Sequence, residues 1–340
     1  MKYFFINLVL TLFFWLPNWF LKIFSRKKGS LIRNSYLDHQ TEIFLNLMDM
    51  FGYKLDTNNF SNIERIRSNN ARMSLNINKK PSNDISLKDI YLKDDRTTFL
   101  RKYEPDNIKT DKTLLFFHGG GYVLGSVETH HNFVASMSVY LGMKIYSVEY
   151  SLSPENKFPI ALRDAKKAYL KIMQEYANKK IILCGDSAGA HLAAALSYDL
   201  CESNIPPPLA QILIYPMVCP SLNYESMELY KENFLLTKSS MQWFWQQLRL
   251  SDVDNHNPRF NLLKQENGKE LQIKTLIVTA GFDPLHDEGI AYADMLEKNG
   301  NEVKRLHFEK LIHGFVNLTN IREANASTIR IFETMKEYLK

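Results

Sequence analysis

The run Ile181-Ile182-Leu183-Cys184-Gly185-Asp186-Ser187-Ala188-Gly189 is the most informative part of this chain. Its first four residues are apolar and have the character of a buried strand, and an Ala-rich segment with helical spacing begins near Gly189. A serine between two glycines at a strand-to-helix junction is typical of a nucleophile elbow, in which the serine occupies a strained turn. Gly185 and Gly189 would let the neighbouring backbones pass closely. Ser187 is therefore the candidate nucleophile.

Apolar strand-like runs alternate with helical patterns from residue 97 onward. This alternation predicts an α/β fold with a mostly parallel sheet flanked by helices. The predicted strands are residues 97–103, 113–117, 144–149, 180–184, 209–215, 274–280 and 302–309. The predicted helices are residues 160–177, 189–202, 286–298 and 324–339, with Asn299-Gly300 as a C-terminal cap.

Two segments do not follow the alternation. Residues 221–262 are aromatic and Met-containing without a sheet-like rhythm, and we interpret them as a helical cap inserted over the active site. Residues 25–95 are polar and contain no run that resembles a central strand, so we expect an N-terminal cap and lead-in helices outside the main sheet. The expected catalytic domain, with its cap insertion, is residues 96–340.

The N-terminal residues 1–24 form a hydrophobic segment that is dominated by Phe, Leu, Ile, Val and Trp from Tyr3 to Phe24. Its length is close to that of a bilayer span, and no small-residue cleavage site follows it. We therefore predict an uncleaved membrane anchor that contacts the membrane through residues 3–24. A polar stripe also fits a helix that lies in the membrane interface, and a helix docked on the protein's own cap is a third interpretation. The basic residues that follow predict a cytoplasmic catalytic domain.

Composition excludes several classes of protein. With 340 residues and 45% hydrophobic residues, the chain can bury a full core. The net charge of +5 is spread along the sequence, which gives no support for nucleic-acid binding. Three widely separated cysteines favour neither a disulfide framework nor a zinc site, and we expect them to be small core residues. The oligomeric state stays open.

Three consecutive glycines follow the predicted strand at 113–117, in the motif His118-Gly119-Gly120-Gly121. Such a loop can turn backbone N–H groups toward a carbonyl oxygen that gains negative charge during acyl transfer. We predict an oxyanion hole from the N–H groups of Gly119, Gly120 and Ala188, with His118 bracing the loop. A phosphate-binding loop is disfavoured because no Lys-Ser/Thr pair follows.

A serine hydroxyl needs a base, and in this kind of fold the acid and then the histidine follow the serine along the chain. Asp283 follows the apolar run that ends near Gly281, and His313 follows the last predicted strand. Both are therefore expected at the carboxyl ends of strands, where open α/β sheets have their sites. We predict a triad of Ser187, Asp283 and His313, which needs neither a metal nor an organic cofactor.

Other titratable residues compete for these roles. His191 lies one helical turn after Ser187 and is expected to serve packing, whereas His130 and His131 are expected to be loop or capping residues. Asp287 and Glu288 are alternative acids, but they fall in the first turn of the next predicted helix, where acidic side chains favour the helix dipole.

The motifs HGGG at 118–121, GDSAG at 185–189, Asp-Pro-Leu at 283–285 and His-Gly-Phe at 313–315 resemble the hormone-sensitive lipase family of esterases. The segment 150–155, Tyr-Ser-Leu-Ser-Pro-Glu, is similar to the family's YRLAPE motif, with Ser151 in place of the usual Arg. The resemblance runs from about residue 97 to the end. It implies the α/β-hydrolase fold, a triad at Ser187, Asp283 and His313, and an oxyanion motif at His118 to Gly121.

These features predict a serine carboxylesterase that acts on short- to medium-chain or lipophilic carboxylic esters, a small-molecule substrate class. Amide cleavage or deacetylation by the same triad is the alternative, because the apolar N-terminus also resembles the arylacetamide deacetylase branch. A hydrolase-like binding protein is disfavoured because such proteins typically lack a member of the triad.

Overall fold

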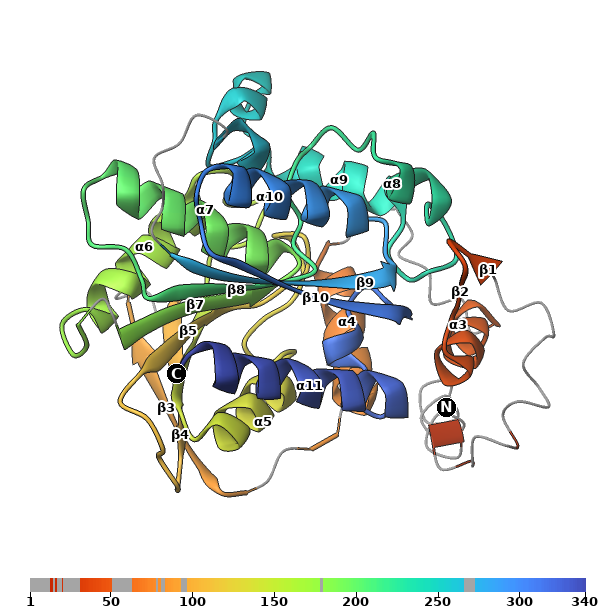
Figure 1. The fold of residues 1–340 in the computed structure, drawn as a ribbon, viewed down its shortest axis with the longest axis horizontal. Coiled ribbons are helices and arrows are strands. Elements are labelled where there is room, and N and C mark those ends of the chain that lie inside the picture. Colours follow the sequence, from red (N-terminus) through yellow and green to blue (C-terminus); the bar gives the residue numbers. More distant parts are fainter. Residues whose placement is uncertain are drawn as a thin grey trace.

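An eight-stranded sheet, with strand order β10-β9-β8-β7-β5-β6-β4-β3, forms the centre of the computed structural model (Figure 1). The structure describes residues 13–14, 16, 20, 31–50, 63–77, 79–80, 83–92, 97–177, 180–265 and 273–340. The strands are β3 (Ile85–Tyr91), β4 (Phe99–Pro105), β5 (Thr113–Phe117), β6 (Lys144–Glu149), β7 (Ile181–Asp186), β8 (Ala210–Ile214), β9 (Lys274–Phe282) and β10 (Val303–Ile312). β4 is antiparallel to both of its neighbours, and the other neighbouring pairs are parallel.

Helices cover both faces of the sheet. Figure 1 shows α6 (Ile160–Ile172), α7 (Ala188–Glu202) and α10 (His286–Lys298) on one face, and α5 (His131–Leu141) and α11 (Arg322–Tyr338) on the other. Side chains on a strand point alternately to the two faces. Leu115 and Phe117 of β5 accordingly belong to the core cluster of the first face, and Leu114 and Phe116 belong to that of the second.

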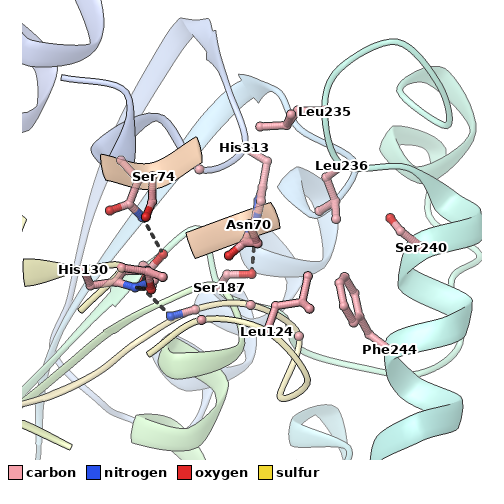
Figure 2. Close-up of a pocket in the computed structure, with 18 of the residues that line it drawn as sticks. Asn70, Ser74, Leu124, His130, Ser187, Leu235, Leu236, Ser240, Phe244 and His313 are labelled. Atoms are coloured by element: carbon pink, nitrogen blue, oxygen red, sulfur yellow. Dashed lines mark hydrogen bonds and ion pairs between the residues drawn. The ribbon is translucent and has the colours of Figure 1, made fainter. Parts of the chain in front are cut away.

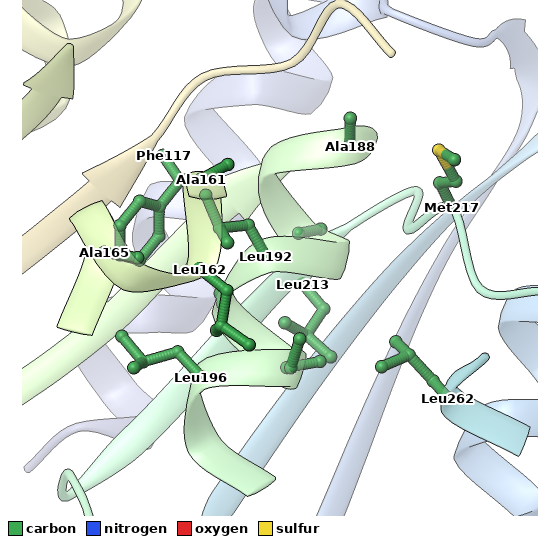
Figure 3. Close-up of a cluster of buried hydrophobic side chains, with 14 of the residues drawn as sticks. Phe117, Ala161, Leu162, Ala165, Ala188, Leu192, Leu196, Leu213, Met217 and Leu262 are labelled. Carbon is green, nitrogen blue, oxygen red and sulfur yellow. The ribbon is translucent and has the colours of Figure 1, made fainter. Parts of the chain in front are cut away.

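Burial on both faces explains why the central strands are continuous apolar runs. Every residue of β5, β7 and β8 is buried. In the cluster of Figure 3, Phe117 and Leu213 of the sheet lie near Leu162 of α6 and Leu192 of α7. This packing fixes the position of β7 and α7, and thus of the turn between them that carries Ser187.

The predicted α/β fold class is confirmed, and the seven predicted strands correspond to β4 to β10. The helix predicted at 160–177 ends earlier, at Ile172. The predicted cap after α10 is present, because Gly300 follows the C-cap residue Asn299 with a φ of +81°. Glycine adopts this left-handed conformation without the strain that a side chain would add.

The prediction that residues 25–95 contribute nothing to the main sheet is wrong for β3. This strand pairs antiparallel with β4, from Ile85 opposite Pro105 to Tyr91 opposite Phe99. β3 is an edge strand with no fully buried residue, and Leu87 and Tyr91 are about half exposed. An edge strand of this kind is held by backbone hydrogen bonds on one side only, so its sequence has no continuous apolar run to reveal it.

The hydrophobic segment predicted as an anchor, residues 1–24, lies almost wholly outside the described residues. Where it is described, Phe13 is buried in the same core cluster as Phe44 of α3 (His39–Met50), and the ring centroid of Phe14 is 6.4 Å from that of Phe44. The Leu16 carbonyl also accepts a hydrogen bond from the Arg322 guanidinium at 2.6 Å. Among the helices that the structure describes, none has the length and apolar character to cross a membrane.

Further helices come from two other parts of the chain. Between β8 and β9 lie α8 (Glu225–Leu229), α9 (Lys238–Leu248) and the 3-10 helices η2 (Asp252–His256) and η3 (Leu262–Gln265). Before the sheet come the short strands β1 (Leu31–Ile32) and β2 (Ser35–Tyr36), then α3 and α4 (Ile63–Ile77). Both α4 and α9 contribute side chains to the pocket that contains Ser187.

Candidate active site

Ser187 occupies the turn between β7 and α7 with φ of 55° and ψ of −119°, a conformation that is strained for a residue with a side chain. The turn is held where the Ser187 N–H donates to the Ile214 carbonyl at 2.9 Å. A Cβ atom on Gly185 would lie 2.3 Å from the Gly189 carbonyl, and one on Gly189 would lie 2.0 Å from the Phe117 oxygen. Both positions therefore require glycine, as the motif predicted.

The three residues predicted as a triad come together at the carboxyl ends of β7, β9 and β10. His313 Nε2 lies 2.9 Å from Ser187 Oγ, and His313 Nδ1 lies 2.8 Å from Asp283 Oδ2. Asp283 is fully buried, and its second oxygen accepts the N–H of Leu285 at 2.8 Å. Because a carboxylate only accepts, Nδ1 donates to Asp283, which leaves Nε2 as the acceptor for the serine proton. This arrangement can activate a hydroxyl.

The alternative acids do not reach His313. The Asp287 carboxylate accepts hydrogen bonds from the Arg33 guanidinium at 2.7 Å and from the Ser226 N–H at 2.8 Å. Glu288 is buried and accepts the N–H of Val218 at 2.7 Å. Burial raises the pKa of Glu288 well above its ordinary value. The geometry therefore favours Asp283 over both alternatives.

The ion pair of Asp287 with Arg33 makes the stability of the fold depend on pH. Burial alone would raise the pKa of Asp287, but the hydrogen bonds from Arg33 and His286 outweigh it and hold that pKa well below the ordinary value of about 3.9. A depressed folded-state pKa contributes stability that is present above pH ~4 and is lost as pH falls further. We expect Asp287→Asn to lower the urea midpoint more at pH 7 than at pH 3. An equal loss at both pH values would contradict this role.

The structure corrects one member of the predicted oxyanion hole. The Gly119 N–H donates to Asp186 Oδ1 at 2.8 Å, so it is not available to a substrate. Gly120 and Gly121, with φ of 116° and 62°, border the pocket, and no acceptor for either N–H is found among the described residues. Ala188, at the start of α7, has an N–H without an intrahelical partner.

Asp186 links the glycine loop to the elbow, a role that its place in the motif did not reveal. It is almost fully buried, and its oxygens lie 3.3 Å from His130 Nε2, 3.4 Å from the Tyr215 hydroxyl and 3.4 Å from Asn317 Nδ2. Burial alone would raise the pKa of Asp186, but His130 and the Gly119 N–H outweigh it and lower that pKa. The sequence offered one signal for these contacts, which is the general rule that a buried carboxylate is hydrogen-bonded.

The remaining histidines differ in how well they were predicted. His118 braces the loop as expected, because its Nδ1 donates to the Gly119 carbonyl at 2.8 Å and burial lowers its pKa to about 3. His191 packs as expected, held by the Tyr122 hydroxyl at 2.7 Å and by the Phe260 carbonyl. His130 and His131 stand at a helix start as expected, His130 as the N-cap residue of α5 and His131 as its first residue, but the His130 side chain makes no cap hydrogen bond and borders the pocket instead.

The pocket around Ser187 has a volume of about 180 Å³ and two unlike sides. Figure 2 shows Ser187 and His313 between the two groups of side chains. The labelled polar residues Ser74 and His130 lie on one side, and the apolar residues Leu235, Leu236 and Phe244 lie on the other, together with Ser240. Asn70 lies near Ser187 and His313 in this view. A small molecule in this pocket can therefore meet hydrocarbon and hydrogen-bonding groups within a few bonds of the serine.

Gly121 is a position where one methyl group should disturb the pocket. A Cβ atom there would lie 2.2 Å from the Phe244 ring, and the φ of 62° disfavours any side chain. We expect Gly121→Ala to displace the glycine loop beside Ser187 and lower kcat by about 10²-fold. The matched control is Gly142→Ala, with a similar φ of 60° and a close neighbour in the Lys109 side chain, at a position that does not line the pocket. Equal kcat losses in steady-state assays of the two variants would contradict the assignment.

Comparisons with known proteins agree with this geometry. Residues 114–317 match the family described as having the α/β hydrolase fold. The carboxylic ester hydrolase LipN of Mycobacterium tuberculosis is 34% identical over 251 residues, which cover 70% of this chain and 66% of LipN, just under two thirds of its length. An ethyl acetate hydrolase of Pseudomonas putida is 30% identical over 257 residues, which cover 73% of this chain and 80% of that enzyme.

A solved structure agrees over more of the chain. The ester hydrolase EH1AB1 from the metagenome of Lake Arreo superposes with a TM-score of 0.81 at 26% identity, and the match covers 89% of this chain and 99% of that one.

Proposed function

This chain belongs to the α/β-hydrolase fold family, in the group that resembles hormone-sensitive lipase, and we propose that it hydrolyses carboxylic esters through an acyl-enzyme on Ser187. The enzyme class is that of the carboxylic ester hydrolases. The observation that carries the proposal is the hydrogen-bonded series from Asp283 through His313 to Ser187, with distances of 2.8 and 2.9 Å, at a pocket.

The proposed reaction begins when Ser187 Oγ attacks the ester carbonyl and its proton moves to His313 Nε2. Asp283 holds the imidazole in the correct tautomer and stabilises the imidazolium that forms. His313 then gives the proton to the departing alkoxide, which leaves as an alcohol. A water molecule, deprotonated by His313, attacks the acyl-enzyme. The bond between the acyl carbon and Ser187 Oγ then breaks, Oγ takes the proton back from His313, and the carboxylic acid is released.

The negative charge on the carbonyl oxygen needs donors that already point toward it. We propose the N–H groups of Gly120, Gly121 and Ala188, since Gly119 is bonded to Asp186. Preorganised donors of this kind each lower the barrier by about 3 to 4 kcal/mol. Asp186 acts through the loop: by holding Gly119, it orients the two glycines that follow.

The substrate range is proposed from the pocket. We propose that α4 and the segment between β8 and β9 form a cap over the serine. The side chains of Leu235, Leu236 and Phe244, from that segment, supply an apolar surface for short- to medium-chain or lipophilic esters. The volume of about 180 Å³ favours the shorter chains.

The test is a kcat/KM series on p-nitrophenyl esters of increasing acyl length, with p-nitroanilides of the same acids beside them. We expect the ester rates to pass through a maximum at short chains and to exceed the anilide rates. Faster anilide cleavage would favour an amidase or deacetylase, and a complete lack of turnover would contradict the proposal.

The N-terminal segment is a separate question. We propose that residues 3–24 associate the enzyme with membranes. The alternative is the docked interpretation, which the packing of Phe13 and Phe14 against the protein itself supports for these two residues. The basic residues after the segment favour a cytoplasmic catalytic domain. If the segment is an anchor, deleting residues 1–24 should move activity from the membrane fraction to the supernatant. Unchanged partitioning would contradict the anchor.

A further inference from the structure

The pocket around Ser187 carries polar side chains that the proposed hydrolysis of the ester bond does not use. The side-chain amides of Asn70 and Asn317 border the same cavity as Ser187. An apolar substrate would take water from these groups and return no hydrogen bond, which costs binding free energy. These amides therefore favour a substrate that carries a hydrogen-bonding group of its own.

Asn317 is the amide whose orientation the structure determines. It ends the 3-10 helix η4 (Phe315–Asn317), which follows His313, and its Nδ2 lies 3.4 Å from Asp186 Oδ2. Asp186 is buried and accepts the Gly119 N–H at 2.8 Å. An ionised carboxylate can only accept hydrogen bonds. The amide of Asn317 must therefore turn its NH₂ group, and not its oxygen, toward Asp186.

The oxygen of the same amide has no hydrogen-bond donor among the described residues. That atom, Asn317 Oδ1, is also buried. A buried acceptor without a donor is costly, so a ligand group that donates to it gains affinity over one that does not. Other atoms of Asn317 border the cavity that contains Ser187, so a bound substrate can supply that donor once the side chain turns Oδ1 slightly toward the cavity.

We propose that Asn317 determines specificity by accepting, at Oδ1, a hydrogen bond from a hydroxyl group on the ester substrate. This inference rests on the proposed ester hydrolysis at Ser187. A hydroxyl suits these amides because it can donate to Asn317 and also accept from an amide such as that of Asn70. The substrate class is a carboxylic ester with an apolar part against the cap and a hydroxyl a few bonds from the scissile carbonyl.

The hydroxyl can belong to the acyl group or to the alcohol, and paired substrates separate these cases. The acyl pair is p-nitrophenyl butanoate and p-nitrophenyl 3-hydroxybutanoate, and the alcohol pair is propyl butanoate and 2-hydroxypropyl butanoate. For each pair, the measured quantity is the ratio of kcat/KM for the hydroxylated ester to that for the plain ester. The ratio is compared between wild type, Asn317→Leu and a control in the apolar group, Leu236→Val.

We expect Asn317→Leu to lower the ratio about tenfold in one of the two pairs, since an unpaired buried acceptor typically costs about that factor. Leu236→Val should change both members of a pair together and keep the ratio. A general disturbance of the hydrogen bonds around Asp186 would slow both esters of a pair equally and would leave the ratio unchanged. A change in the ratio therefore reports recognition of the hydroxyl group. Melting temperatures establish that both variants fold.

A fall in the acyl pair alone would support the proposal with the hydroxyl on the acid, and a fall in the alcohol pair alone would support it with the hydroxyl on the alcohol. Ratios that are the same in wild type and Asn317→Leu for both pairs would overturn it. That outcome differs from failure of the proposed function, in which none of the four esters would be hydrolysed.

Discussion

Replacing Ser187 with alanine should reduce ester turnover by roughly 10⁴- to 10⁶-fold and leave the protein folded. The reason is that Ser187 Oγ, 2.9 Å from His313 Nε2, is the atom proposed to form the covalent bond with the acyl group. No neighbouring hydroxyl has the same base beside it among the described residues. The measurement is kcat on p-nitrophenyl butanoate, with circular dichroism and melting temperature to establish the fold.

A serine on α7 provides the matched control for this experiment. Ser197 is fully buried, and its hydroxyl has no hydrogen-bond partner among the described residues. Ser197→Ala should therefore retain full activity. Activity near wild type in Ser187→Ala, or a comparable loss in Ser197→Ala, would remove Ser187 from its proposed role.

Asp283→Asn should cost about 10⁴-fold in kcat while the three residues stay in place. Asp283 Oδ2 accepts the proton on His313 Nδ1, and an asparagine in its place can present an N–H to that nitrogen instead. The imidazole would then carry its proton on Nε2, where it cannot accept the proton of Ser187. A pre-steady-state assay of the acylation step measures this loss directly.

Asp287→Asn is the control, because Asp287 lies in the same part of the chain and pairs with Arg33 rather than with His313. It should change kcat by less than about tenfold, although it lowers stability at neutral pH. A larger loss in Asp287→Asn than in Asp283→Asn would exchange the roles of the two acids.

The sequence predicts those parts of the fold in which local pattern and burial agree. β5 and β7 are buried on both faces, so their apolar runs are visible without any knowledge of their neighbours. β3 escapes prediction because it owes its place to pairing with β4, and half-exposed residues such as Leu87 do not distinguish an edge strand from a loop.

The site was predictable as a set of residue types in a fixed order, but its hydrogen bonds were not. A glycine loop next to an elbow predicts an oxyanion hole, yet which N–H groups are free depends on what else lies nearby. Asp186 takes the Gly119 N–H, and this moves the proposed hole one residue along the chain. His130 and Asn317 were missed for the same reason, because only the folded chain brings them to Asp186.

The most direct measurement of the central claim is the site of covalent modification by a p-nitrophenyl alkylphosphonate, which imitates the tetrahedral intermediate of ester hydrolysis. One equivalent should react, activity should be lost in proportion, and mass spectrometry of the digested protein should find the added mass on the peptide that contains Ser187. An adduct on a different residue, or full activity after stoichiometric labelling of Ser187, would contradict the account.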